Sequence, residues 1–136
     1  VIANGQALEK LAEFVDAQGG RKEEVYDTEL LPKAQYVEEI ISEEEGYISG
    51  IVCDEIGICS LILGGGRETK ESEIDLSVGL VLRKKKGDYV KKGESLATIH
   101  ANDLDKLEVA KKRFLAAYSF TDKEFKPEAL IRGVVE

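Results

Sequence analysis

The chain has 136 residues, of which 43% are hydrophobic and 34% charged, and its 19 basic and 27 acidic side chains give a formal net charge of −8 at pH 7. This length suits one compact domain with a small additional element, and the acidic balance argues against nucleic acid as a partner, because a polyanion requires a basic surface. The sequence contains neither a signal-peptide pattern nor an apolar run near the roughly 18 residues of a membrane span, so we expect a cytoplasmic protein without a membrane contact.

Residues 4–19 have the pattern of a helix with a marked start and end. Asn4 can cap the first turn, and Gly19 can close the last turn in the left-handed conformation. The apolar side chains between them recur at helical spacing, namely Leu8, Leu11, Phe14 and Val15. This spacing predicts an amphipathic helix at the start of the chain.

An acidic connector containing Pro32 follows the helix and cannot continue it. We place a domain boundary there, with residues 1–34 as a helix and linker and residues 35–136 as a second domain. The second domain opens with two short runs of β-branched and aromatic residues, "YVEEIIS" and "GYISGIV", which predict two strands.

The next segment, "DEIGICSLILGGG", suits either a buried strand or a helix, and we favour a short helix. Asp54 can cap its start and Gly64 can end it. The apolar residues that recur at helical spacing are Ile56, Cys59 and Leu63. We expect both cysteines, Cys53 and Cys59, to be small buried hydrophobic residues of a reduced protein.

Further strands and turns are expected after the glycines. Alternating apolar residues predict a strand over residues 76–82, with Leu76, Val78, Leu80 and Leu82 on one face. Gly87-Asp88 and Lys92-Gly93 mark two turns around Tyr89-Val90, and residues 96–99 form the next strand.

The clearest helix lies between residues 102 and 120. Its apolar face comprises Leu104, Leu107, Ala110, Phe114 and Tyr118. Asn102 or Asp103 can cap its start. The tail contains one more apolar run, residues 129–135, which we expect to add an edge strand.

The stretch "LGGGRETKESEID" raises the question of anion binding, because three glycines precede Arg67 and Lys70. A Walker loop requires Lys and then Ser or Thr directly after its second glycine, whereas Arg67 stands there. A dinucleotide-binding loop requires a strand before the glycines and a helix after them, which reverses the order expected here. The residues alone leave two interpretations open, a plain connecting loop and a functional lid or anion contact.

No other residues form a recognisable active site. The basic run at residues 83–86 is typical of a solvated strand end. His100, the single histidine, has no evident nucleophile or acid beside it, so we expect a structural role. No Cys or His spacing suits a metal ion. We therefore assign no catalytic, cofactor-binding or metal-binding residue.

One segment, "VGLVLRKKKGDYVKKGESLATIHA", resembles the strand-turn-strand unit of biotinyl and lipoyl carrier domains. The matching positions are Gly87, Asp88, Val90, Gly93 and Leu96. In such a carrier the modified lysine would fall near Asp103, where this chain has no lysine. The scaffold is carrier-like, but the residue that would bear the cofactor is missing.

Taken together, the segments resemble the C-terminal part of pyrimidine nucleoside phosphorylases, the family of thymidine phosphorylase. The similar stretches are "NGQALEKLAEFVDAQGG", "LPKA", "GYISGIV" and "LILGGGRETKESEIDLSVGLVLRKKKGDYVKKGESLATIHAN". The resemblance implies an α+β fold in which a helix from a large α/β domain precedes a C-terminal α/β-hammerhead domain. That domain is barrel-sandwich-like and related to biotinyl and lipoyl scaffolds.

The activity that this resemblance implies is phosphorolysis of uridine or thymidine in pyrimidine salvage, a pentosyl transfer that yields the base and a ribose or deoxyribose 1-phosphate. The family's phosphate-binding, catalytic and base-binding residues lie in an N-terminal region whose motifs do not occur here. Its potassium ligands lie there too. The resemblance therefore implies no cofactor in this chain and no activity of the chain alone.

We expect the chain to be an excised C-terminal portion of such an enzyme and a monomer by itself. The complete enzyme is expected to be a homodimer that binds phosphate and a pyrimidine nucleoside. The contribution of this portion would be a loop that closes the cleft between the domains, comprising Gly64, Gly65, Gly66, Arg67 and Lys70. The alternative is a stand-alone, non-catalytic binding or adaptor module on a lipoyl-like scaffold.

Overall fold

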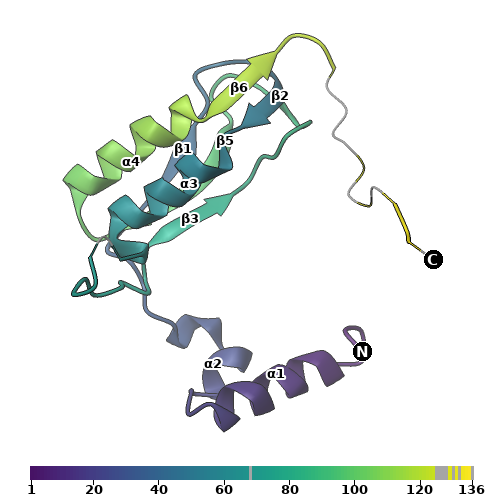
Figure 1. The fold of residues 1–136 in the computed structure, drawn as a ribbon, viewed down its shortest axis with the longest axis vertical. Helices are drawn as coiled ribbons and strands as arrows, with labels where there is room; N and C mark the ends of the chain where they lie inside the picture. Colours follow the sequence, from purple (N-terminus) through teal and green to yellow (C-terminus); the bar gives the residue numbers. More distant parts are fainter. Residues whose placement is uncertain (68, 125–128, 130, 132, 136) are drawn as a thin grey trace. The chain divides into compact units, whose positions relative to one another are not determined.

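The chain folds into two compact units, Val1–Lys33 and Ala34–Glu136 (Figure 1). The structure is a computed structural model, and it describes residues 1–67, 69–124, 129, 131 and 133–135. Within this described part, no helix has the length and hydropathy that crossing a membrane requires. The assignment of the first unit to a larger α/β domain stays a prediction.

The first unit is helical, with α1 (Gln6–Ala17), the single turn α2 (Glu23–Tyr26) and a 3₁₀ turn (Thr28–Leu30). The predicted helix is confirmed, and Gly19 follows it with a left-handed φ of 78°. The acidic connector is not extended, because it contains two short helical turns before Pro32.

The start of α1 differs from the prediction by one residue. Gly5, with a φ of 81°, occupies the capping position. The Asn4 side chain lies outside it, where its Oδ1 accepts the Gln6 backbone N–H at 3.2 Å. The positive φ of this turn favours glycine over asparagine at the cap itself.

The apolar face of α1 remains largely exposed in this chain. The exposed fractions are 46% for Leu8, 50% for Leu11 and 60% for Phe14. Ala12 is the one buried residue of the helix. Among the described residues, the predicted stripe of α1 is therefore covered only in part.

The second unit is built on two small antiparallel sheets, which confirms an α+β fold. The first sheet has the order β1-β5-β3, with β1 at Tyr36–Ile41, β5 at Ser95–Ala101 and β3 at Gly79–Leu82. The second has the order β4-β2-β6, with β4 at Tyr89–Val90, β2 at Gly46–Ile51 and β6 at Tyr118–Thr121. The consecutive strands β1 and β2 thus belong to different sheets.

Two helices pack side by side over one face of the first sheet (Figure 1). They are α3 (Cys53–Ser60), which continues into a π-helical turn at Leu61–Gly65, and α4 (Leu104–Ala116). The core between helices and strands includes the fully buried Phe114, Ile40, Ile48, Leu96, Ile99 and Leu107. Burial of such side chains is the main favourable term for folding.

Two expectations about α3 are wrong. Val52, not Asp54, occupies the capping position, and no side chain caps the helix. The chain passes directly from β2 into the helix, and the Val52 N–H donates to the Ala117 carbonyl at 2.9 Å, which sets the start before Asp54 is reached. Cys59 is buried as expected, whereas Cys53 in the first turn is exposed.

The strand predicted over residues 76–82 is shorter than expected. Only Gly79–Leu82 is a strand, and Leu76 is 81% exposed. The Asp75 carboxylate accepts both the N–H and the Oγ–H of Ser77, so this part of the chain forms a local turn and not a ladder.

The secondary structure after α4 also differs from the prediction. α4 stops at Ala116, and Tyr118, which matched the helical spacing, begins strand β6. The edge strand predicted for residues 129–135 includes residues 130 and 132, which lie outside the described residues, and the described residues of that run are not in a strand.

Candidate functional site

The glycine loop, defined here as residues 64–75, leaves the π-helical end of α3. Gly64 has a φ of 105°, a conformation that side chains other than glycine rarely adopt, and it ends the helix as the sequence predicts. At Gly65 a Cβ atom would lie 2.8 Å from Ser60 Oγ and 3.2 Å from the Ser60 carbonyl oxygen. These two glycines are therefore required by the backbone of the loop entrance.

The two ends of the glycine loop are joined by a backbone hydrogen bond. The Asp75 N–H donates to the Gly64 carbonyl at 2.9 Å, so the chain returns to its starting point after eleven residues. Within the loop, the Thr69 N–H donates to Ser72 Oγ at 3.0 Å and the Ser72 N–H donates to the Thr69 carbonyl at 3.3 Å. The loop is thus closed at its base and contains a turn of its own.

A cluster of polar side chains stabilises the end of the loop. Asp75 accepts Ser77 Oγ–H at 2.6 Å and the Ser77 N–H at 2.9 Å, and Asn102 Nδ2 donates to Asp75 at 2.6 Å. These hydrogen bonds, from Ser77 first and then from Asn102, hold the pKa of the Asp75 carboxyl below its usual value. This cluster was not predicted from the sequence; the Asp-Leu-Ser spacing of an Asx turn was the available signal for its Asp75–Ser77 contact.

Arg67 and Lys70 are the two basic residues of the glycine loop, and both side chains are exposed. No ion pair joins either of them to another residue that the structure describes. Two cations on an exposed loop can meet an anion, but Glu68, Glu71 and Glu73 lie close to them in the sequence and partly offset their charge. The loop is an electrostatically mixed surface and not a phosphate cradle.

The elements that flank the glycine loop confirm that it is neither standard phosphate loop. A helix, α3, precedes the glycines, and a charged loop follows them before β3 begins at Gly79. A phosphate loop would instead present the amino end of a helix that starts directly after the glycines. No helix starts at that point among the described residues of the loop.

The carrier interpretation also fails at its decisive position. Asp103 is the capping residue of α4, and its Oδ1 accepts the Lys106 N–H at 3.0 Å. A helix therefore follows β5 directly, whereas a carrier presents its lysine at the tip of a tight hairpin. The capping role predicted for this residue is confirmed.

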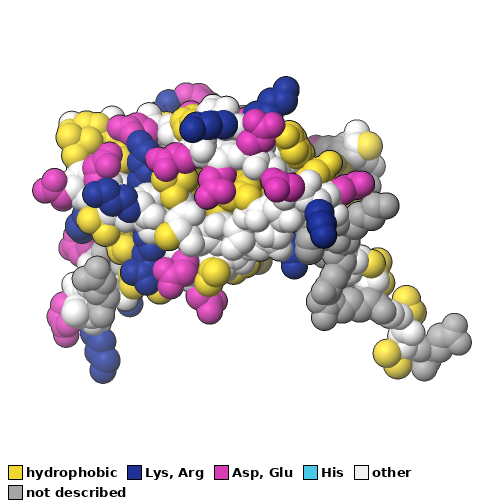
Figure 2. Space-filling view, turned by 90° about the horizontal axis from the view of Figure 1, so that it is seen from above, with side chains coloured by type: hydrophobic (Ala, Val, Ile, Leu, Met, Phe, Trp, Pro, Cys, Tyr) yellow, Lys and Arg dark blue, Asp and Glu magenta, His cyan; other side chains and the backbone are white. Residues whose placement is uncertain are grey.

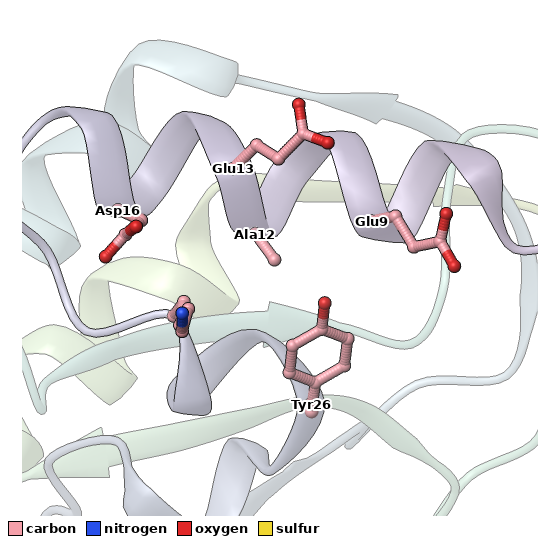
Figure 3. Close-up of a pocket in the computed structure, with 6 residues that line it drawn as sticks. Glu9, Ala12, Glu13, Asp16 and Tyr26 are labelled. Carbon is pink, nitrogen blue, oxygen red and sulfur yellow. The ribbon is translucent and has the colours of Figure 1, made fainter.

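A hollow of about 340 Å³ in the first unit is a second candidate. It is lined by Glu9, Ala12, Glu13, Asp16, Lys22 and Tyr26 (Figure 3). Figure 3 shows the Tyr26 hydroxyl pointing toward α1, with Glu9 and Asp16 to either side and the Glu13 carboxylate on the side of the helix away from Tyr26. Three carboxylates against one lysine do not suit phosphate, because the hollow is net acidic.

The remaining sequence candidates do not form a site. His100 lies within β5, opposite Val37 and Gly79. Among the described residues, no group of three or more His, Cys, Asp or Glu side chains is arranged to hold a metal ion. In the face shown in Figure 2, Lys and Arg are interspersed with Asp and Glu and do not gather into a basic patch.

Comparison with known proteins identifies what the chain is similar to. Residues 47–121, which include the glycine loop, match the family "Pyrimidine nucleoside phosphorylase C-terminal domain". A pyrimidine-nucleoside phosphorylase of Staphylococcus haemolyticus is 52% identical over 82% of this chain, one of Bacillus subtilis is 52% identical over 75%, and one of Staphylococcus aureus is 42% identical over 99%. The matched regions are 26%, 24% and 31% of those relatives, so the chain spans about a quarter to a third of their length.

Proposed function

Because the chain belongs to the pyrimidine nucleoside phosphorylase C-terminal domain family, we propose that it serves as the loop-bearing domain of an enzyme that phosphorolyses pyrimidine nucleosides. The observation that carries this proposal is the match over residues 47–121 together with relatives of that name at about 50% identity. The second unit would be an α/β-hammerhead domain related to biotinyl and lipoyl scaffolds.

The first unit would belong to the large α/β domain of the enzyme. The exposed stripe of α1, with Leu8, Leu11 and Phe14, supports this assignment, because an amphipathic helix is stabilised mainly by packing of its apolar face. In the complete enzyme, other segments of the large domain would cover that stripe.

The proposed reaction is a displacement at the anomeric carbon of the nucleoside. A phosphate oxygen forms the new bond to that carbon, the bond to the pyrimidine nitrogen breaks, and the base leaves with the electron pair. An enzyme accelerates such a step by orienting two substrates and by stabilising an oxocarbenium-like transition state. The groups that do so, and any potassium site, would lie outside this chain, and the complete enzyme would be a homodimer.

The glycine loop would close over the cleft in which this reaction takes place. Its base is fixed by the hydrogen bond between Gly64 and Asp75, while Arg67 and Lys70 extend from it with positive charge. Closure of a loop over bound substrates excludes water and strengthens electrostatic contacts. The loop as a whole carries more acidic than basic residues, but Arg67 directly follows the glycines, so its guanidinium would be the group that approaches a bound phosphate.

A chimera tests the proposed function. This chain would replace the matching C-terminal region of the Bacillus subtilis relative, and release of uracil or thymine would be followed by ultraviolet absorbance with phosphate present. We expect the chimera to release the base, whereas the isolated chain and a relative truncated before the matching region release none. A folded but inactive chimera, or turnover by the isolated chain, would contradict the proposal.

A further inference from the structure

Asn102 lies where three segments of the second unit meet. Its Nδ2 donates to Asp75 Oδ2 at 2.6 Å and to Ser77 Oγ at 2.9 Å, and its Oδ1 accepts the Gln35 backbone N–H at 2.7 Å. Asp75 ends the glycine loop, and Gln35 directly follows the boundary between the two units at Lys33 and Ala34. One carboxamide therefore joins the base of the loop to the first residues of the second unit.

We propose that Asn102 is a positioning residue that couples the glycine loop to the first residues of the second unit, at its boundary with the first unit. A displacement of the backbone at Gln35 reaches Asp75 through the Asn102 side chain, because both residues hydrogen-bond to that side chain. Any effect of this coupling on catalysis, through closure of the glycine loop, rests on the proposed function. The coupling itself depends only on the hydrogen bonds.

The partners leave the Asn102 amide only one orientation. The carboxylate of Asp75 is an acceptor, so it must face the NH₂ group, and the backbone N–H of Gln35 is a donor, so it must face the oxygen. Asparagine thereby satisfies a donor and an acceptor on opposite sides with one rigid group. Aspartate would keep the acceptor for Gln35 and lose both donors to the loop.

The role differs from that of a helix cap. The neighbouring residue Asp103 caps α4 through its contact with the Lys106 N–H, and Asn102 makes no hydrogen bond to that helix in the described part of the chain. The loop base is otherwise held by the Gly64–Asp75 backbone hydrogen bond and by the Asp75–Ser77 turn. Asn102 is therefore the side chain that connects the base of the glycine loop to Gln35, which is remote from the loop in sequence.

Hydrogen exchange followed by mass spectrometry tests the coupling in the complete 136-residue chain. In Asn102→Ala, we expect amides of residues 66–75 and of residues 34–36 to exchange about three- to tenfold faster, as befits the loss of partly exposed hydrogen bonds. In Asn102→Asp, the loop should accelerate by a similar factor, while residues 34–36 keep their acceptor and their exchange rate.

Asp103→Ala is the matched control, because it removes the cap of α4 and leaves Asn102 intact. It should accelerate exchange in the first turn of α4 and leave the glycine loop unchanged. If Asn102→Ala does not fold, Asp75→Ala removes the loop-side partner and should accelerate exchange in the loop and, to a smaller extent, at residues 34–36, because the loop then no longer holds the Asn102 side chain that accepts the Gln35 N–H. Unchanged loop exchange in the folded variants, or equal acceleration by Asp103→Ala, would overturn the coupling. These hydrogen-exchange results do not depend on catalysis, so the coupling can fail while the proposed function, tested by the chimera, still holds.

Discussion

Helices with similar apolar patterns differ in burial between the two units. In the second unit α4 buries Leu107, Ala110 and Phe114 completely, whereas in the first unit α1 leaves Leu8 and Phe14 about half exposed or more. Both helices have apolar residues at helical spacing, and both were expected from the sequence. The difference teaches that periodicity predicts the helix and its apolar face, while the surface that covers this face depends on what else is present.

The largest expected effect comes from a pair of identical substitutions, one in each unit. Phe114 is fully buried and its ring centroid lies 4.9 Å from that of Tyr118, so Phe114→Ala should cost about 3–5 kcal/mol in the free energy of unfolding. Phe14 is 60% exposed, so Phe14→Ala should cost no more than about 0.5 kcal/mol. Urea denaturation of both variants measures this difference in unfolding free energy. Equal losses would contradict the stated difference in burial between Phe114 and Phe14.

Alkaline pH should act on the same core of the second unit. Burial raises the pKa of Tyr118 to about 12, above the unfolded value of about 10. The stability gained from a neutral Tyr118 is therefore fully present below pH about 10 and is lost as the pH rises through about 12. Ultraviolet titration of tyrosinate should show a late step that disappears in Tyr118→Phe; an unchanged titration would show that another tyrosine is the buried one.

The helix starts offer a smaller contrast. Asp103 caps α4 with its own carboxylate, so Asp103→Ala should lower the unfolding free energy by about 1 kcal/mol. Asn4 lies outside the cap of α1, and Asn4→Ala should cost only a few tenths of that, about 0.3 kcal/mol. Thermal unfolding followed by circular dichroism compares the two variants. A larger loss from Asn4→Ala would mean that the cap of α1 is misassigned.

The smallest effect is expected at acidic pH. Hydrogen bonds from Ser77 and Asn102 lower the pKa of Asp75, so their contribution to stability is present above the unfolded value of about 4 and is lost as the pH falls through the lower folded value. Asp75→Asn should flatten the fall of stability below pH about 4. Ser77→Ala keeps the Asp75 carboxylate and removes the Ser77 hydroxyl that donates to it, so it should flatten the same fall in part. Urea denaturation as a function of pH measures both slopes, and an unchanged slope in Asp75→Asn would contradict the assignment.

The sequence predicted the regular elements better than the places where the chain changes direction. Strands β1, β2 and β5 followed from runs of β-branched and apolar residues and from the turn residues between them. The cap of α4 was predicted as Asn102 or Asp103, and the structure selects Asp103. The α+β class came from the family resemblance and not from periodicity. The start of α3 could not be predicted, because Val52 is fixed by a hydrogen bond to the remote Ala117 carbonyl. Strand β6 was missed because Tyr118 continues the apolar spacing of α4.

The candidate site was also predicted only in part, because some of its features are local in sequence and others depend on remote contacts. The glycines at the helix end were read correctly, since the positive φ of Gly64 is a local requirement. The contact between Asp75 and Ser77 is local and follows from their spacing, but Asn102 lies 27 positions from Asp75, and no local pattern shows that these two residues meet. The role of Arg67 and Lys70 in closing a cleft remains a prediction, since it concerns surfaces outside this chain.

The most direct test of the central claim is the steady-state kinetics of Arg67→Ala in the chimera with the Bacillus subtilis relative. If the glycine loop closes over the substrates, loss of this cation should raise KM for phosphate or nucleoside about tenfold. The control Lys92→Ala removes a charge from the β4–β5 turn and should leave KM and kcat unchanged. Equal KM and kcat for Arg67→Ala and the unmodified chimera would contradict the account and make the stretch a plain connector.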